Sequence, residues 1–265
     1  KTGLMLIFLN GTSQQISKSS FEGVRMENLK LSLNGQQLIE LYRKMAVEGF
    51  NRTDGKYESE AYNKFQLIKF KDLILPYFEK YSIKTVLDYG SGGSDWEKAG
   101  FDQNNNDSAK DFFSLETISI YEPARGIDQR KKSDCVVCCD VLEHIFILDV
   151  PTVLRDICSY AKGLVVLNIA CYEAHALLPN GENAHISIRD PMWWKGTLDT
   201  ISIDFPSVNI LLLCTTDFYT VQIFERWKAN DWETSTNFRV DVSVPEKSQI
   251  SEPDPLAFMK KKYGL

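Results

Sequence analysis

The chain has 265 residues, 43% of them hydrophobic and 25% charged, and this globular composition excludes disordered, collagen-like and coiled-coil proteins. Lys and Arg number 30 against 36 Asp and Glu, so the net charge is −6. Because an acidic chain has no general attraction for phosphate backbones or anionic lipids, we expect neither generic nucleic-acid binding nor membrane binding. The 6 cysteines are too scattered for a disulfide scaffold and indicate a reducing, cytoplasmic setting.

Residues 1–56 form a mixed segment, which we expect to be an accessory or lid element. Its apolar run Gly3 to Leu9 is far shorter than the roughly 20 residues that cross a bilayer, and it predicts a strand. Apolar side chains recur at helical spacing over Gln36 to Val47 and predict a helix that packs on the core. A second helix is expected from Ser59 to Lys80, kinked or ended by Pro76.

Short apolar runs alternate with turns and helices over residues 57–228, which predicts one α/β domain with a mostly parallel sheet. Only Thr215 to Phe218 joins the last two runs. This link is too short for a parallel crossover, so these strands should form an antiparallel hairpin. Residues 229–265 are polar and are expected to form a tail. The six expected strands are Thr85–Tyr89, Thr117–Tyr121, Cys135–Cys139, Leu164–Ile169, Val208–Cys214 and Tyr219–Phe224.

Three successive strands of this domain end in acids. The first ends near Asp88 and runs into a glycine-rich loop, which lets the backbone approach a ligand at the carboxyl end of a parallel strand. The second ends in Glu122, where it can accept hydrogen bonds from the ribose hydroxyls of a nucleoside. The third ends in Asp140. An acidic floor of this kind suits a ligand that has hydroxyls and a positive charge.

Motifs at these strand ends carry a family resemblance. VLDYGSGGS, SIYEPA and DCVVCCDVLEHI resemble the class I S-adenosylmethionine-dependent methyltransferases, whose first motif has the form hhDhGxGxG. YEPA, DVLEHI, LPNGENAH and a Trp-Trp pair further resemble a narrower bacterial and phage group within that superfamily. The resemblance covers roughly residues 85–227. It implies an α/β, Rossmann-like fold and S-adenosyl-L-methionine as the cofactor.

The resemblance also implies a place for individual residues around that cofactor. Glu122, followed by Pro123, would bind the ribose hydroxyls. Asp140 and Val141 would lie beside the cofactor at the third strand end. The residues implied to surround its methionine part are Asp88, Gly90, Ser91 and Gly92.

Two departures from the family pattern affect the expected fold. Ser94 stands where the third motif glycine belongs. Only Pro123 to Asp134 separates Glu122 from the next strand, which leaves little room for the helix, strand and adenine loop that usually intervene. We therefore expect the usual outermost strand to be lost, which leaves six strands, and the loop Ala124 to Gln129 to close over adenine.

The long polar connection from Ala170 to Pro191 is the expected acceptor site, because acceptors approach from loops at the same strand ends. His185 is the candidate base or acceptor ligand, since a neutral histidine suits proton transfer near pH 7. Asn183 is the candidate to orient the substrate. The alternative is that His185 only satisfies loop backbone, and His144 and His175 are weaker candidates.

The expected function is methyl transfer from S-adenosyl-L-methionine to a small or medium-sized acceptor, with Trp193 and Trp194 as candidates for the acceptor pocket or the core. A catalytically silent cofactor-binding or scaffold protein is a second reading. A NAD-dependent oxidoreductase is less favoured, because Asp95 takes the third glycine position of GxGxxG and an acid there opposes a pyrophosphate. No metal site is expected, since Cys135 and Cys138 would point to opposite faces of a strand.

Overall fold

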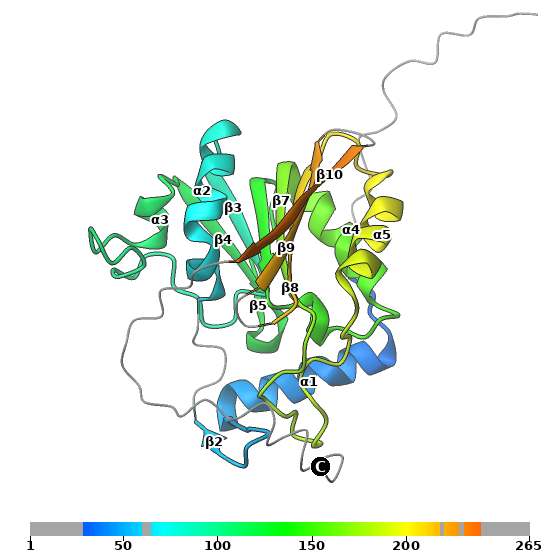
Figure 1. Cartoon of the computed structure of the whole chain (residues 1–265). Helices are drawn as coiled ribbons and strands as arrows, with labels where there is room; N and C mark the ends of the chain where they lie inside the picture. The colour runs from blue at the N-terminus through cyan, green and yellow to red at the C-terminus, as the bar shows by residue number, and fades with distance from the viewer. Residues whose placement is uncertain (1–28, 60–64, 218–219, 228–230, 240–265) are drawn as a thin grey trace, which may run out of the picture.

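The computed structural model describes residues 29–59, 65–217, 220–227 and 231–239. The strand expected at Gly3 to Leu9 lies outside the described residues, as does the end of the chain from residue 240. A central sheet divides the described chain into layers, with helices on both of its faces (Figure 1). None of the described helices is long and apolar enough to cross a membrane.

The central sheet has eight strands in the order β10-β9-β8-β7-β6-β3-β4-β5. The central neighbours β8, β7, β6, β3 and β4 pair in parallel. The outer strands β5, β9 and β10 pair antiparallel with their neighbours. The strand bounds are β3 Thr85–Tyr89, β4 Thr117–Glu122, β5 Ile127–Asp128, β6 Ser133–Cys139, β7 Ala161–Ala170, β8 Asn209–Thr215, β9 Thr220–Trp227 and β10 Asp231–Arg239.

The mostly parallel sheet and the antiparallel hairpin of β8 and β9 confirm the predicted α/β class. The predicted count of six strands is wrong, because two further strands extend the sheet at its edges. β10 lies in the segment predicted to be a polar tail, and it covers the backbone groups that β9 would otherwise leave unpaired. At the other edge, the segment expected to close over adenine forms the short helix η2 (Pro123–Arg125) and the edge strand β5.

The helices agree in part with the expected ones. The first, α1, confirms the helix predicted over Gln36 to Val47. The helix start predicted at Ser59 is wrong, because α2 begins only after the 3-10 helix η1. Pro76 lies inside α2 without ending it, because it removes only one helical N–H donor. The bounds are α1 Leu33–Glu48, η1 Gln66–Phe70, α2 Lys71–Lys80, α3 Ala109–Phe112, η3 Leu142–His144, α4 Val150–Tyr160 and α5 Pro191–Ser202, with a small hairpin of β1 Phe50–Asn51 and β2 Tyr57–Glu58.

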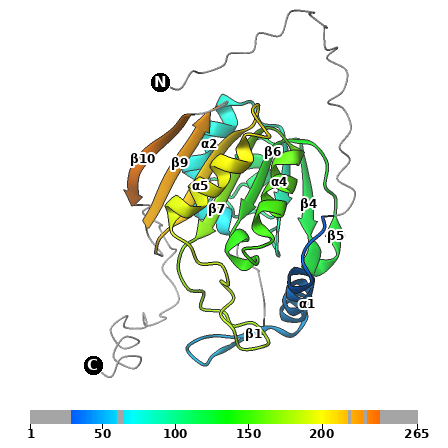
Figure 2. The same ribbon diagram turned by 90° about the vertical axis from the view of Figure 1, so that its right-hand side faces the viewer.

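Apolar side chains cover both faces of the sheet. In Figure 2, α4 and α5 lie in front of the sheet and α2 lies behind it. The front cluster includes Trp194 of α5, and the rear cluster includes Ile74 of α2. Cys135 and Cys138 belong to opposite clusters, which confirms that these two thiols of β6 face apart.

The strand order changes direction between β3 and β6. From β3 the chain moves to β4 on one side, and then to β6, β7 and β8 on the other. A sheet with such a reversal leaves a crevice at the carboxyl ends of the two strands where the direction changes. Helix α1 lies across this end of the sheet (Figures 1 and 2). The fold therefore indicates a ligand site between these strand ends and α1.

Helix α1 is fastened to the start of α4 by one buried carboxylate. Ser32, the N-cap of α1, donates from its backbone N and its Oγ to Asp149, at 2.8 and 2.7 Å. Gly35 allows this approach, because a Cβ at that position would lie 2.3 Å from Asp149 Oδ2. Asp149 is only 3% exposed, so water replaces these hydrogen bonds poorly.

We predict that Asp149→Ala loosens α1 and leaves the sheet intact. Loss of two hydrogen bonds to a charged group removes about 1.5 to 3 kcal/mol for each. Amide hydrogen exchange in α1 should therefore accelerate by at least about tenfold, while exchange in β7 stays unchanged. Asp204→Ala, which removes only an exposed 3.4 Å ion pair with Arg155, is the matched control. Equal protection of α1 in the Asp149 variant and the wild type would show that the carboxylate does not hold the helix.

Candidate functional site

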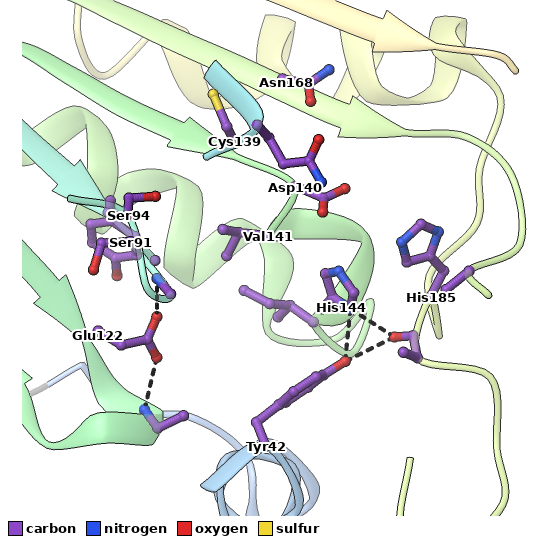
Figure 3. A pocket seen from close by; sticks show the side chains of 18 of the residues that line it. Tyr42, Ser91, Ser94, Glu122, Cys139, Asp140, Val141, His144, Asn168 and His185 are labelled. Carbon is purple, nitrogen blue, oxygen red and sulfur yellow. Dashed lines mark hydrogen bonds between the residues drawn. The ribbon is translucent and has the colours of Figure 1, made fainter. Parts of the chain in front are cut away.

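A cavity of about 570 Å³ opens at the carboxyl ends of β3, β4 and β6, and its volume is typical of small-molecule sites. Every residue that the motifs assign to the cofactor lines it. Figure 3 shows Glu122 and Ser91 at one side, Asp140, His144 and His185 at the other, and Val141 between them. The assigned residues in the lining are Asp88, Gly90, Ser91, Gly92, Glu122, Pro123, Asp140 and Val141.

The glycine loop after β3 lies close against the end of β6. Gly90 has φ +82°, and its N–H donates to the Tyr121 carbonyl at 2.7 Å. A Cβ on Gly90 would lie 2.5 Å from Cγ2 of Val141. The first glycine of the motif is therefore required by both its backbone conformation and its neighbour, which gives the loop a fixed path along the cavity floor.

Glu122 ties this loop to the end of β4. Its carboxylate accepts from the backbone N–H of Gly92 at 2.7 Å and of Ala124 at 3.0 Å. The residue is only 8% exposed, and burial raises the pKa of the carboxyl, whereas the two N–H donors lower it. Because each carboxylate oxygen has two lone pairs, the side chain keeps acceptor capacity for a ligand in the cavity.

Asp88 is a deeply buried acid at the end of β3, in the cavity lining. Its Oδ2 accepts from Nε1 of Trp96 at 2.7 Å, and the residue is 5% exposed. Burial raises the pKa of Asp88 to about 7, against the opposing hydrogen bond from Trp96, and the charge of Glu122 adds to the rise. The floor is therefore less negative at neutral pH than its count of acids suggests. Trp96 itself was not among the predicted site residues.

Asp140 holds an unusual backbone conformation at the far side of the cavity. Its φ is +60°, in the left-handed region that costs a non-glycine residue about 1 to 3 kcal/mol. Its N–H donates to the Asn168 carbonyl at 3.0 Å. This turn at the end of β6 directs the Asp140 carboxylate toward His185 (Figure 3).

His185 and His144 form a pair in the same wall. Their ring centroids are 4.7 Å apart at an interplanar angle of 81°. Burial lowers the pKa of His185, and burial together with the neighbouring His185 lowers the pKa of His144 to about 4. Both rings are therefore neutral near pH 7. His144, which the sequence offered as a weaker candidate for the base than His185, is the direct neighbour of His185 in the structure.

Asn183 does not line the cavity, although it was the candidate to orient the substrate. Its Oδ1 accepts from the N–H groups of Ala174 and His185 at 3.0 and 2.9 Å, and its Nδ2 donates to the Ala174 carbonyl at 2.8 Å. The amide is thus used to shape the loop that carries His185. His175 is an exposed residue of the same loop that lines the cavity.

The Trp-Trp pair belongs to the core and not to the cavity. Trp194 is fully buried, Trp193 packs against the same cluster, and their rings meet edge to face at 4.9 Å. Neither lines the cavity. The expectation that one of the two is core is confirmed. The structure therefore places both rings in or against the core that α5 forms with the sheet, away from this cavity.

Four residues in the histidine wall bring metal-binding atoms together. One potential ligand atom from each of Asp140, Glu143, His144 and His185 lies within 4.8 Å of the others. No metal site was expected from the sequence. The signal that could have indicated it is the spacing of two acids and a histidine over five positions at the end of a strand, in DVLEH.

Helix α1 supplies the apolar roof of the cavity. Leu38, Ile39 and Met45 line it together with Tyr42. The Tyr42 hydroxyl lies 2.8 Å from His144 Nδ1 and donates to the Ala184 carbonyl at 2.9 Å. Helix α1 of the N-terminal segment therefore forms part of the cavity lining.

Comparison of the chain with family models, with curated proteins and with solved structures gave no match in any of the three. We therefore infer the chemistry of this cavity from the residues that line it.

We predict that Gly90→Ala destabilises the fold through two separable causes. A positive φ costs a residue with a Cβ about 1 to 2 kcal/mol, and the collision with Val141 adds about 1 to 3 kcal/mol. Adding Val141→Ala should recover the collision part alone. Urea unfolding of the wild type, both single variants and the double variant measures this coupling. Wild-type stability of Gly90→Ala, or strict additivity in the double variant, would contradict the packing described above.

Proposed function

We propose that the protein is an S-adenosyl-L-methionine-dependent methyltransferase with a small or medium-sized acceptor, built on a Rossmann-like sheet. The observation that carries this proposal is the position of Glu122. It ends the strand next to β3, lines the cavity and holds the glycine loop by a 2.7 Å hydrogen bond. An acid in this position of a dinucleotide-type fold accepts hydrogen bonds from ribose hydroxyls.

The acids of the cavity support a cofactor that carries hydroxyls and a positive charge. Asp88, Glu122 and Asp140 come from three neighbouring strand ends and line one cavity. Even with Asp88 partly protonated near pH 7, such a wall would repel a pyrophosphate, whereas it attracts a sulfonium ion. Val141 lies between the Glu122 side and the histidine side (Figure 3). The bound cofactor would supply an electrophilic methyl group.

The histidine side supports acceptor binding and proton removal. His185 is neutral near pH 7 because burial lowers its pKa, and a neutral imidazole can accept a proton from an acceptor group. Apolar side chains of α1 line the cavity, and apolar walls of this kind limit the access of water to the reacting atoms. A small acceptor fits the volume of about 570 Å³ that it would share with the cofactor.

We predict that removal of the Glu122 carboxylate weakens cofactor binding selectively. Calorimetric titration of Glu122→Ala with the cofactor and with its demethylated product should give at least about tenfold weaker binding, since two charge-assisted hydrogen bonds are lost at about 1.5 to 3 kcal/mol each. Glu122→Gln keeps the size of the side chain and should fall between this variant and the wild type.

Glu116→Ala is the control for this titration, because Glu116 is an exposed acid close to the start of β4. Thermal unfolding of each variant separates lost affinity from a disrupted loop. Unchanged affinity in Glu122→Ala would refute the ribose role. Cofactor binding by the wild type without turnover of a panel of hydroxyl, amine and carboxylate acceptors would favour a catalytically silent binding protein.

A further inference from the structure

The atoms of the histidine wall are spaced as the ligands of one ion would be. The ligand atoms of Asp140, Glu143, His144 and His185 all lie within 4.8 Å of one another. Nitrogen and oxygen ligands bind zinc-like ions at about 2.0 to 2.2 Å, so two ligands on opposite sides of an ion lie up to about 4.4 Å apart. The upper limit of 4.8 Å on every pair of atoms is therefore close to the span of a single coordination shell.

Both histidines are held in the orientation that metal-binding histidines adopt. Nδ1 of His144 lies 2.9 Å from the Ala184 carbonyl, and Nδ1 of His185 lies 2.5 Å from the Tyr172 carbonyl. A carbonyl oxygen can only accept, so Nδ1 of His185 carries the ring proton. The same holds for His144, because the Tyr42 hydroxyl beside its Nδ1 donates its one proton to the Ala184 carbonyl. Each Nε2 then keeps its lone pair. A backbone carbonyl behind the ring is the usual device that sets the tautomer of a metal ligand.

Glu143 supplies an independent sign that a ligand is bound here. The side chain is fully buried. One oxygen, Oε1, accepts from the Ala170 N–H at 2.5 Å, while Oε2 has no hydrogen-bond partner among the described residues. Buried polar atoms are nearly always paired, and a second carboxylate, Asp140, stands in the same cluster. A cation would satisfy the open oxygen and balance both acids.

The donor set indicates the class of ion. Two imidazoles and two carboxylates suit Mn²⁺, Fe²⁺ or Zn²⁺, whereas Mg²⁺ and Ca²⁺ prefer oxygen ligands alone. Asp140, His144 and His185 line the cavity, and Glu143 does not. We propose that these four residues bind one divalent transition-metal ion in the cavity wall, with its remaining coordination positions open to the cavity. If the proposed methyl transfer holds, those positions would bind an oxygen or nitrogen atom of the acceptor. Nε2 of His185 would then hold the ion, so the ion, and not the imidazole, would favour loss of the acceptor proton.

The full chain, stripped with a chelator, provides the test without any cofactor. We expect one Mn²⁺ or one Zn²⁺ to bind for each chain in calorimetric titration. The electron paramagnetic resonance of bound Mn²⁺ should show coupling to imidazole nitrogen. Absence of stoichiometric binding for both ions, or bound Mn²⁺ without nitrogen coupling, would overturn the proposal. This readout uses the wild type only, so it stands even where a variant fails to fold.

Variants locate the ion in the cluster. Glu143→Gln and His185→Ala should each weaken Mn²⁺ binding by at least about tenfold. Substitution of a residue that only orients a metal ligand weakens metal binding about 10- to 100-fold, so loss of a ligand itself should weaken it at least as much. His175→Ala, which alters the exposed histidine of the same loop, should bind as the wild type does. Wild-type affinity in folded Glu143→Gln and His185→Ala would overturn the assignment. If Glu122→Ala binds the metal and also binds the cofactor with unchanged affinity, the ribose role of Glu122 is refuted, whereas the metal site is supported.

Discussion

The parallel pairing of β4, β3 and β6 is the constraint on which the whole site depends. Parallel neighbours end at the same edge of a sheet, and here three of those ends carry Asp88, Glu122 and Asp140 into one cavity. Bringing acids together in a buried place is unfavourable unless donors or cations compensate. Much of the surrounding structure supplies that compensation.

The compensation differs on the two sides of the cavity. On the glycine-loop side, Trp96 donates to Asp88, and the N–H groups of Gly92 and Ala124 donate to Glu122. On the histidine side, donors are fewer and an oxygen of Glu143 is left open among the described residues. The first side is complete as it stands and suits a hydroxyl-bearing ligand. The proposed cation would complete the second side, and Val141 lies between the two sides in one cavity.

The sequence predicted what depends on local pattern. Buried parallel strands read as apolar runs, so the strands that carry the acids were located, and the acids at their ends identified the cavity. Edge strand β10 was missed, because its pairing with β9 is a tertiary contact that a polar segment does not reveal. The cluster proposed to bind a metal was missed for the same reason, since His185 comes close to Glu143 only through the path of a long loop. Asn183 and Trp194 show the reverse error: the sequence proposed both for the acceptor site, but Asn183 shapes a loop and Trp194 packs in the core. Polar or aromatic character in a motif does not by itself place a side chain in a cavity.

A crystal structure of the full chain with the demethylated cofactor bound would test the central claim most directly. We predict that the ribose hydroxyls lie within hydrogen-bond distance of the Glu122 carboxylate, and that the sulfur faces past Val141 toward Asp140 and His185. A ligand bound outside this cavity, or a ribose turned away from Glu122, would contradict the account.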